Sequence, residues 1–357
     1  MSVQVKRRRD TAANVAAFTP AQGELIVDIT NNRLIVGDGA TVGGWPAARS
    51  IDMPGGFVNK FINGTMGVWP EGTSFSATTS GRYTADGWIV TPTGASVAVS
   101  QSGGLRLTKA ALQITGASGV TDVMVSQRIE SYIAAQLCGQ QVTVQVLVNN
   151  QTGSAIVPTL TVKRPATQDG WGGSIYTDIN AVNLQSCANN ASTLLSYTFA
   201  ANSACYQGLQ ISFDFGNNFG SGAKSISLSE ADIRVTPWAG VGFNGAPAAE
   251  LRLDAIEAAL GQRNFVQMNI SNGFTFIDQN AASAGVNLLC PFTLPVPMRA
   301  IPTTSIFGTV TASNCSSTIY PAAGGNQLVT LSSSATAAGR AFVTTSSGFG
   351  FSATARL

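Results

Sequence analysis

The sequence predicts a mainly β protein built from several small domains. Charged residues make up only 11% of its 357 residues, against roughly 25% in typical soluble domains, and glycine occurs 38 times. Short apolar runs separated by turn residues recur along the chain, and one stretch has helical periodicity. We therefore expect a small N-terminal hairpin module, a jelly-roll or β-sandwich domain, a short helix and a C-terminal β-sandwich.

The N-terminal module, residues 1–50, is predicted from short strands and tight turns. Alternating apolar residues predict strands at 2–7, 24–29 and 33–36. Asn31 and Asn32 suit a two-residue hairpin turn, and Gly37-Asp38-Gly39 suits a second turn that Trp45 closes. Strands this short bury too little apolar surface to be stable alone. We expect the module to associate with copies of itself or with a larger particle.

Four consecutive basic residues, Lys6, Arg7, Arg8 and Arg9, precede this hairpin. One interpretation is a solvated strand edge whose charges discourage the addition of another strand. The other is an electrostatic contact with an acidic partner surface, and the sequence leaves both open. No apolar segment follows the run, so an export signal is not expected.

Residues 6–47, KRRRDTAANVAAFTPAQGELIVDITNNRLIVGDGATVGGWPA, resemble the N-terminal module of phage tail-fibre and major tropism determinant proteins. The resemblance implies a trimeric, β-prism-like base that attaches a fibre or spike to a virion. The resemblance also implies that the basic run at Lys6–Arg9 is the virion-docking contact. The matching positions are Arg8, Arg9, Thr11, Ala12, Gly23, Glu24, Leu25, Asp28, Arg33, Leu34, Gly37, Asp38, Gly39, Thr41 and Trp45.

Residues 57–240, which follow a Pro- and Gly-containing linker at 51–56, are predicted to form the jelly roll. About ten short apolar runs without a long helix are typical of a β-sandwich, and alternation is clearest at 142–148 and 209–215. The domain also resembles carbohydrate-binding-module-like jelly rolls of phage tail fibres, except that Gly87 stands where that pattern commonly has Arg. The matching positions are Asn63, Gly64, Met66, Trp69, Gly72, Thr73, Ser74, Phe75, Tyr83, Thr84, Ala85, Asp86, Trp88, Gln127, Arg128, Ile129 and Glu130.

The region 246–263 contains the predicted helix, over residues 247–261. Proline suits its first turn and glycine its end. Ala249, Leu253, Ile256 and Leu260 recur at the spacing of a coiled-coil seam. Two heptads are too short to be stable alone. We expect a short trimeric coiled coil, with an amphipathic helix packed on its own chain as the alternative.

Residues 264–357 are predicted to form the C-terminal β domain, with strands near 274–278, 304–311, 327–331, 341–344 and 350–355. Its polar loop provides an alternative binding tip, although an ordinary hairpin loop is the favoured interpretation. The loop residues concerned are Asn314, Ser316, Ser317, Tyr320 and Asn326.

The side chains available for catalysis are few. The chain has no histidine, which removes the usual general base and the Ser-His-Asp triad. The five cysteines lack metal-ligand spacing, and we expect free thiols, with Cys187–Cys205 and Cys290–Cys315 as alternative disulfides. Glu230 and Asp232 fall on one face of a strand, where a surface edge or a structural calcium ligand set is favoured over a catalytic pair. No cofactor is expected apart from such a calcium ion.

Sugar binding requires flat apolar rings surrounded by amides and carboxylates. Trp69 and Trp88 belong to the jelly-roll pattern and are expected in the core. Trp171 instead lies in a glycine-rich polar loop with Asp169, just before Tyr176. Because loops often carry exposed binding groups, we predict Trp171, Asp169 and Tyr176 as the carbohydrate-binding residues. A loop tryptophan that folds back onto the sheet is the alternative.

Together these patterns predict a non-enzymatic virion fibre or spike protein. We expect a homotrimer that contacts other virion proteins of tail or capsid, is assembled in the host cytoplasm and binds host surface polysaccharide. A net charge of +2 argues against nucleic acid as the main partner, and no apolar run is long enough for membrane insertion. The alternatives are a glycan depolymerase and a structural connector or decoration protein without a ligand.

Overall fold

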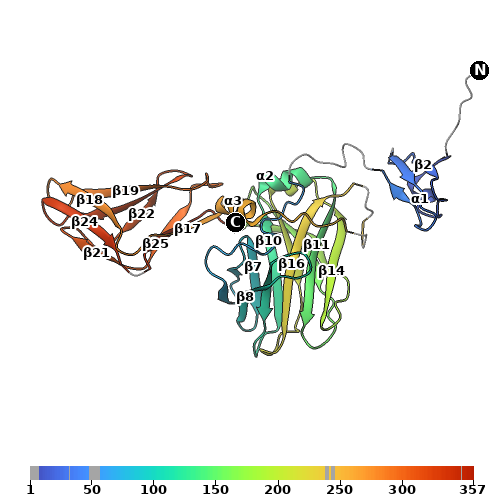
Figure 1. Ribbon diagram of the computed structural model, residues 1–357, viewed down its shortest axis with the longest axis horizontal. Coiled ribbons are helices and arrows are strands. Elements are labelled where there is room, and N and C mark those ends of the chain that lie inside the picture. The colour runs from blue at the N-terminus through green and yellow to red at the C-terminus, as the bar shows by residue number, and fades with distance from the viewer. Residues whose placement is uncertain (1–7, 32, 48–56, 238–240, 243–245, 347) are drawn as a thin grey trace, which may run out of the picture.

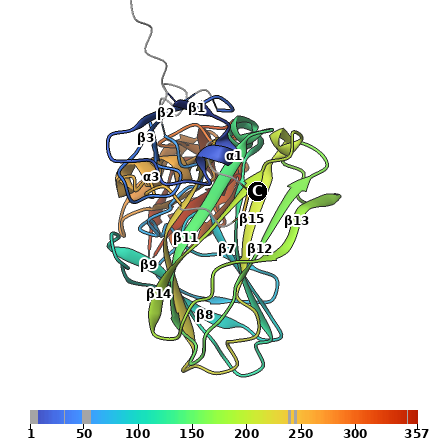
Figure 2. The same cartoon turned by 90° about the vertical axis from the view of Figure 1, so that its right-hand side faces the viewer.

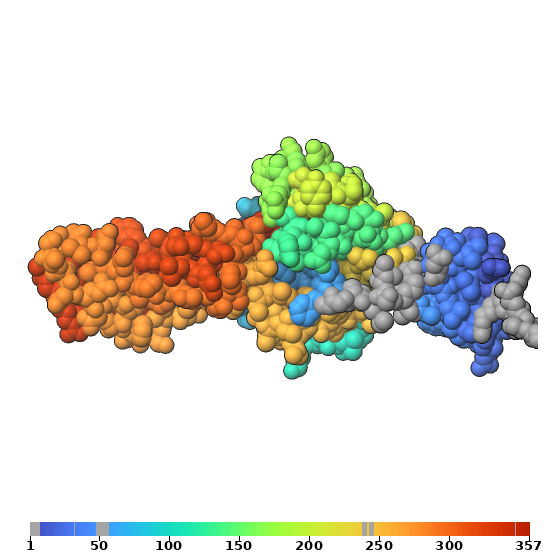
Figure 3. Space-filling view, turned by 90° about the horizontal axis from the view of Figure 1, so that it is seen from above, coloured from blue at the N-terminus to red at the C-terminus, as the bar shows by residue number. Residues whose placement is uncertain are grey.

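The computed structural model describes residues 8–31, 33–47, 57–237, 241–242, 246–346 and 348–357. Three β-rich parts follow one another along its longest axis: the N-terminal module in blue, a central sandwich and a C-terminal domain in orange and red (Figure 1). Seen from above, the sandwich is the broadest part (Figure 3). The predicted mainly β fold is confirmed, with six sheets in the described residues.

The N-terminal module is one four-stranded sheet in the order β1-β2-β3-β4, with β1 parallel to β2. Its core is small: Val15, Ile26 and Ile35 are buried, and Phe18 packs against them. The predicted strand at 2–7 lies outside the described residues. The elements are β1 (Arg8–Asp10), α1 (Ala12–Val15), β2 (Leu25–Asp28), β3 (Arg33–Val36) and β4 (Trp45–Pro46).

Two turns shape this module. The prediction of a two-residue hairpin turn was wrong, because Asp28 pairs with Arg33 and four residues connect the strands. The Asp28 carboxylate accepts hydrogen bonds from the backbone N–H groups of Thr30 and Asn31 at 2.9 and 3.1 Å, which favours the longer turn. In the second turn the Trp45 Nε1 donates to Asp38 at 2.8 Å. A hydrogen bond from the Thr41 hydroxyl is the largest cause that holds the pKa of Asp38 well below its usual value.

The central sandwich consists of two six-stranded sheets in the orders β13-β12-β15-β10-β7-β6 and β14-β11-β16-β9-β8-β5. Figure 2 shows β11 and β14 on one side and β12, β13 and β15 on the other. The strands are β5 (Ser74–Ala77), β6 (Arg82–Tyr83), β7 (Trp88–Thr93), β8 (Val97–Gly103), β9 (Ala110–Thr115), β10 (Asp122–Ile129), β11 (Gln141–Gln151), β12 (Thr159–Pro165), β13 (Ile175–Asn183), β14 (Ala191–Ala200), β15 (Leu209–Asp214) and β16 (Ser225–Val235).

Alternation along the strands builds the sandwich core. In β11, Val142 and Val146 lie beside Phe199 and Leu195 of β14, and all four are buried. Trp88 is fully buried against Phe61, and Trp69 is partly buried against the same core, as the sequence predicts. Three short helical turns complete the domain: α2 (Ser131–Ala134), η2 (Ala135–Leu137) and η3 (Cys205–Gln207).

The prediction of a helix over 247–261 was wrong in its first half. Helix α3 spans Asp254–Gln262, so Ala249 precedes it and Leu253 is its N-cap, 74% exposed. Side chains of the sandwich engage the preceding backbone: Gln145 donates to the carbonyl of Pro247 at 2.8 Å, and Asp232 accepts from the N–H of Glu250 at 2.6 Å. The segment before Asp254 therefore finds hydrogen-bond partners in the sandwich and not within a helix of its own.

Helix α3 packs on its own chain, which was the alternative to a coiled coil. Its buried residues are Glu257 and Gly261. Glu257 pairs with Arg252 at 3.1 Å, and a Cβ at Gly261 would lie 1.7 Å from Asp86. The four-residue seam is therefore not formed on one helix, although Ile256 and Leu260 remain half-buried on α3. Association of copies through α3 stays a prediction.

The C-terminal domain holds three antiparallel three-stranded sheets, β17-β25-β20, β18-β24-β21 and β19-β23-β22, around one apolar core. Phe276 stacks on Phe349 in that core at 5.2 Å. The predicted strand at 304–311 is divided at Gly308, whose φ is 76°. The strands are β17 (Phe265–Asn269), β18 (Thr275–Ala281), β19 (Asn287–Thr293), β20 (Thr303–Phe307), β21 (Val310–Ser313), β22 (Tyr320–Ala323), β23 (Leu328–Ser334), β24 (Gly339–Thr345) and β25 (Gly350–Thr354). Within the described ranges, no helix is both long and apolar enough to cross a membrane.

Candidate functional site

Asp169 joins four parts of the structure. Its carboxylate accepts hydrogen bonds from the Ser131 N–H at 2.9 Å and from the Ser131 hydroxyl at 3.1 Å, and it pairs with Arg299 of the C-terminal domain at 3.3 Å. Its own N–H donates to the carbonyl of Gln207 at 2.8 Å. The carboxylate proposed to bind sugar hydroxyls is therefore already engaged, and it holds the β12–β13 loop against α2 and η3.

Trp171 lies in the same loop and is only partly exposed. The Arg128 guanidinium lies 5.0 Å from the centroid of its ring, a cation–π contact. The ring also approaches Gly208, where an added Cβ would lie 3.4 Å from Trp171 Cζ2. The loop thus folds Trp171 toward the sheet, the arrangement given above as the alternative to an exposed binding ring.

Tyr176 is half exposed in β13, an edge strand of its sheet. The Arg164 guanidinium lies 4.5 Å from the centroid of the Tyr176 ring and pairs with Asp178 at 3.1 Å. Of the three predicted residues, Tyr176 presents the most accessible ring. The loop and β13 are consecutive, so all three lie near one end of the sandwich.

Two exposed aromatic residues at this end were missed by the sequence analysis. Tyr132 on α2 is 72% exposed and Tyr206 on η3 is 54% exposed. Both lie in helical turns of three or four residues between strands, which are too short to show a periodic pattern. Their composition could still have identified them, because they are aromatic residues in polar connections, where binding residues concentrate.

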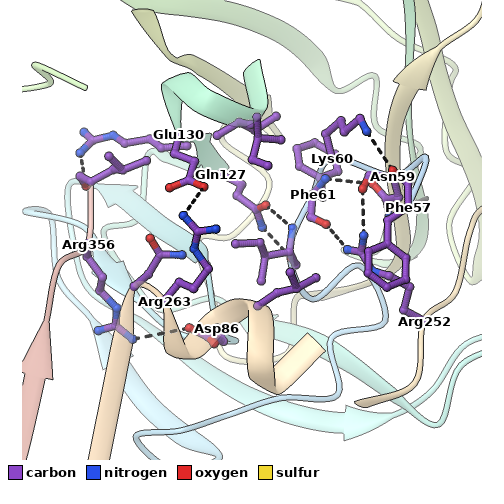
Figure 4. A pocket seen from close by; sticks show the side chains of 18 of the residues that line it. Phe57, Asn59, Lys60, Phe61, Asp86, Gln127, Glu130, Arg252, Arg263 and Arg356 are labelled. Carbon is purple, nitrogen blue, oxygen red and sulfur yellow. Dashed lines mark hydrogen bonds and ion pairs between the residues drawn. The ribbon is translucent and has the colours of Figure 1, made fainter. Parts of the chain in front are cut away.

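A cavity of about 270 Å³ lies where α3 and the C-terminal domain meet the sandwich. Figure 4 shows Glu130 and Arg263 pointing toward each other on one side and Arg252 beside Phe57 on the other. The lining residues are Phe57, Asn59, Lys60, Phe61, Ile62, Tyr83, Asp86, Gly87, Gln127, Arg128, Ile129, Glu130, Ile133, Gln136, Arg252, Leu260, Arg263, Asn264, Arg356 and Leu357.

The charged groups of this cavity mostly pair across the junction. Glu130 pairs with Arg263 at 3.1 Å, and burial is the main cause that raises the pKa of Glu130. Burial raises the pKa of Asp86 to about 6, against the opposing effect of Arg356 at 4.0 Å. Because these partners belong to the same chain, the cavity wall also fastens the C-terminal domain to the sandwich.

The acids weighed as a catalytic pair are internal ion-pair partners. Glu230 is buried at a β-bulge with φ 51° and pairs with Arg106. Asp232 is also buried and pairs with Arg234. Each carboxylate therefore neutralises an arginine of its own domain.

A second pair of acids, Asp122 and Asp214, escaped the sequence analysis as a pair. Burial, followed by a hydrogen bond with Asp214, raises the pKa of Asp122 to about 6. Their strands β10 and β15 are neighbours in the sheet. Burial and the neighbouring charge of Asp214 thus both favour the protonated form of Asp122.

The basic run is only partly described. Arg8 pairs with Glu24 at 3.6 Å, and its guanidinium lies 3.7 Å from the centroid of the Phe18 ring. Arg9 is exposed, whereas Lys6 and Arg7 lie outside the described residues. Arg8 therefore has a structural contact, and Arg9 is the described residue of the run that is open to a partner.

All five cysteines are free thiols, the favoured interpretation of the sequence. The closest sulfurs are those of Cys138 and Cys205, 3.0 Å apart, a pairing that the sequence analysis did not consider. Burial raises the pKa of the Cys205 thiol. In the described part of the chain, no group of three or more acidic, cysteine or histidine side chains could hold a metal ion.

Comparison with known proteins identifies the N-terminal segment. Residues 5–41 match the major tropism determinant N-terminal domain family. Over 49 residues the chain is 49% identical to the tail fiber receptor-binding protein of Bordetella phage BPP-1, a match that covers 14% of this chain and 13% of that protein. The predicted resemblance of this segment is confirmed, and the chain matches about one eighth of the curated relative's length.

Solved structures show weaker likeness over about half of the chain. One is the enzymatically active domain of tailspike protein 4 of bacteriophage CBA120, with 12% identity, a TM-score of 0.34 and coverage of 50% of this chain and 22% of that one. Another is the CBM22-1 xylan-binding domain of Paenibacillus barcinonensis Xyn10C, with 18% identity, a TM-score of 0.30 and coverage of 46% and 94%. Because both TM-scores are below 0.5, the sandwich architecture is inferred only from the strand order of this chain.

Proposed function

We propose that this protein is a virion fibre or spike component that docks through its N-terminal module and binds host surface polysaccharide through its central sandwich. The observation that carries the proposal is the match of residues 5–41 to the major tropism determinant N-terminal domain family. The chain is also 49% identical over 49 residues to the tail fiber receptor-binding protein of Bordetella phage BPP-1. The protein would be assembled in the host cytoplasm and carried on the particle's tail or capsid.

The surface of the N-terminal module supports docking and trimer formation. Its buried core is confined to a few residues, yet Leu34, Val36, Val42 and Trp45 are exposed. Large apolar side chains on so small a unit favour contact with another surface. We assign that surface to two further copies of this chain and to the virion, with Arg9 contributing charge at the rim.

The central sandwich supports the binding role. Trp171, Asp169 and Tyr176 lie in or beside one loop, at an end where other aromatic side chains are exposed. The exposed aromatic rings are not part of the apolar core of the sandwich, so they can bind a ligand without removing side chains from that core. Aromatic rings with polar neighbours suit pyranose rings and their hydroxyls.

Cell binding tests this function. Fluorescently labelled protein is incubated with a panel of bacterial strains, with and without prior periodate oxidation of the cell surface. We expect a strain that binds the full chain, and periodate should abolish that binding because it cleaves sugar vicinal diols. A protein that binds no strain, or one whose binding survives periodate but not protease, would contradict the polysaccharide assignment.

A glycan depolymerase is the second candidate, because Asp122 lies beside a second acid, Asp214, and burial raises the pKa of Asp122. Glycosidases separate their two carboxyl groups by about 5 Å or more so that the glycosidic bond fits between them. Asp214 adds to burial in raising the pKa of Asp122, and Met124, two residues after Asp122, pairs with Asp214 on the neighbouring strand. The two carboxyl groups therefore lie close together and not across a sugar-sized gap. We therefore propose binding without cleavage; the appearance of new reducing ends in a bound polysaccharide, lost in Asp214→Asn, would establish the enzyme instead.

A further inference from the structure

Three exposed tyrosines gather at the end of the sandwich where α2, η3 and β13 meet. Tyr132 is 72% exposed, Tyr206 54% and Tyr176 50%. They are half of the six tyrosines in the chain. We call these three residues the tyrosine face. None of them belongs to the apolar core of the sandwich.

Asp169 connects two members of the tyrosine face through their sequence neighbours. Its carboxylate binds Ser131, which precedes Tyr132, and its N–H binds the carbonyl of Gln207, which follows Tyr206. The same turns are in contact at Cys205, whose thiol donates to the carbonyl of Ala134 at 3.3 Å. The two short turns that carry Tyr132 and Tyr206 are therefore fixed side by side.

Asp178 connects the third member to this end. It pairs with Arg164, whose guanidinium covers one face of the Tyr176 ring at 4.5 Å. It also accepts a hydrogen bond at 3.1 Å from Asn202, three residues before η3. The start of β13 is thus tied to the segment that leads to Tyr206, and Tyr176 remains 50% exposed beside Arg164.

The charges beside the tyrosine face are paired within the chain. Arg164 and Asp178 form one pair, and Arg299 and Asp169 form another, with all four side chains mostly buried. The tyrosine face therefore presents aromatic rings and phenolic hydroxyls to a ligand. Side-chain hydrogen bonds hold these residues in place. This chemistry suits uncharged pyranose rings, which stack their C–H faces on aromatic rings and hydrogen bond through their hydroxyls.

We propose that the tyrosine face is the polysaccharide-binding surface, with Tyr132, Tyr176 and Tyr206 stacking on successive uncharged pyranose rings. The proposal rests on the proposed polysaccharide-binding function and places it on specific residues. Asp169 is a positioning residue here: it orders the two turns and touches no sugar. The cavity beside α3 is lined by Ile133 and Gln136 of the α2–η2 segment but by none of the three tyrosines, so the tyrosine face is a separate surface.

The test uses the full chain and an array of purified bacterial capsular and O-antigen polysaccharides, followed by calorimetry on each one bound. The Tyr132→Ala/Tyr176→Ala/Tyr206→Ala variant should lose at least about tenfold in affinity, since each stacked ring contributes to binding. The corresponding triple Phe variant keeps the rings and should stay within about threefold of the wild type. Phe274→Ala is the matched control, because Phe274 is an aromatic residue of the C-terminal domain that is 52% exposed and belongs to neither candidate binding surface.

The outcomes separate this inference from the function on which it rests. A triple Ala variant that melts like the wild type and binds as tightly would overturn the tyrosine face and leave polysaccharide binding intact. Equal loss in the Phe and Ala variants would also overturn it, because the rings would then not carry the affinity. A wild-type chain that binds no polysaccharide on the array contradicts the proposed function itself. Cell binding that needs the tyrosines but survives periodate would assign the face to a protein partner and overturn the proposal.

Discussion

The N-terminal module and the central sandwich differ in how much apolar core each buries. The module buries Val15, Ile26 and Ile35 and leaves Trp45 and Val42 exposed. The sandwich encloses an extensive core, and its buried charges such as Glu257 and Asp232 have partners from the same chain. A domain with an extensive core of its own can leave its surface free for a ligand. A small module with exposed apolar side chains needs another protein surface to cover them.

The largest effect is expected at the ion pair that fixes the segment before α3. Arg252 binds Glu257 and also donates to the carbonyls of Asn59 and Phe61. Arg252→Met would leave Glu257 charged and buried, and we expect a loss of about 3–5 kcal/mol in the free energy of unfolding, measured with urea. The double variant Arg252→Met/Glu257→Met should recover much of that loss. A single variant as stable as the wild type would break the claim that internal partners stabilise the sandwich.

A smaller effect of opposite sign is expected from oxidation of Cys138 and Cys205. With oxidised glutathione, the two thiols should lose two protons and two electrons to form a disulfide, and the glutathione disulfide takes up both to become two glutathione thiols. The bond would close a long loop and stabilise the sandwich by about 2–4 kcal/mol. Mass spectrometry of peptides and a melting curve measure both results. Cys138→Ser should abolish the change and Cys290→Ser should retain it; five thiols still free after oxidation would contradict the prediction.

The free energy of unfolding should depend on pH through Asp86, which lies where α3 and the C-terminal domain meet the sandwich. Its pKa in the folded chain is about 6 against an ordinary value of 3.8, with burial as the main cause. The folded state therefore binds the proton more tightly, so this contribution is complete below about pH 4 and is lost as the pH rises through 6. The difference corresponds to an upper value on the order of 3 kcal/mol.

Denaturation at a series of pH values, in wild type and Asp86→Asn, isolates this contribution. The variant should lack the fall in stability between pH 4 and 6 that Asp86 causes. Arg356, Glu71 and Glu257 also influence the pKa of Asp86 and remain in both proteins, so the difference between the two curves belongs to Asp86. Two curves that run parallel across this window would show that burial of Asp86 does not shape the junction.

The smallest effect on stability is expected from the module's exposed apolar residues. Leu34→Ser/Trp45→Ala should change the unfolding free energy of the sandwich by less than about 0.5 kcal/mol, because distant sites act independently. The same variant should lose self-association, measured by sedimentation. A variant that still associates would place the contact elsewhere, and one that destabilises the sandwich would break the division between the two regions.

Alternation predicted the strands well at two inner strands of the sandwich sheets, although nearly every residue of both strands is buried. The run at 209–215 corresponds to β15, Leu209–Asp214, and that at 142–148 lies inside β11. The helix prediction failed before Asp254 because Gln145 and Asp232 supply hydrogen-bond partners from distant strands. Local periodicity contains no information about such partners.

The carbohydrate-binding residues stay a prediction, and the structure shows only where they lie. The loop with Trp171 and Tyr176 does lie at an end of the sandwich where aromatic rings are exposed. Asp169 could not be recognised as a brace, because Ser131 and Arg299 are 38 and 130 residues away from it in the chain. Tyr132 and Tyr206 were missed because their exposure follows from how α2 and η3 pack, which no short turn reveals in its own sequence.

The mass of the protein in solution tests the central claim most directly: a self-sufficient sandwich is attached to a module that needs copies of itself. Light scattering at micromolar concentration should give three times the mass of one chain for residues 1–357 and the mass of a single chain for residues 57–357. A trimer that persists without residues 1–56 would move the association to α3 or the C-terminal domain. A full-length chain that stays monomeric at that concentration would contradict the account.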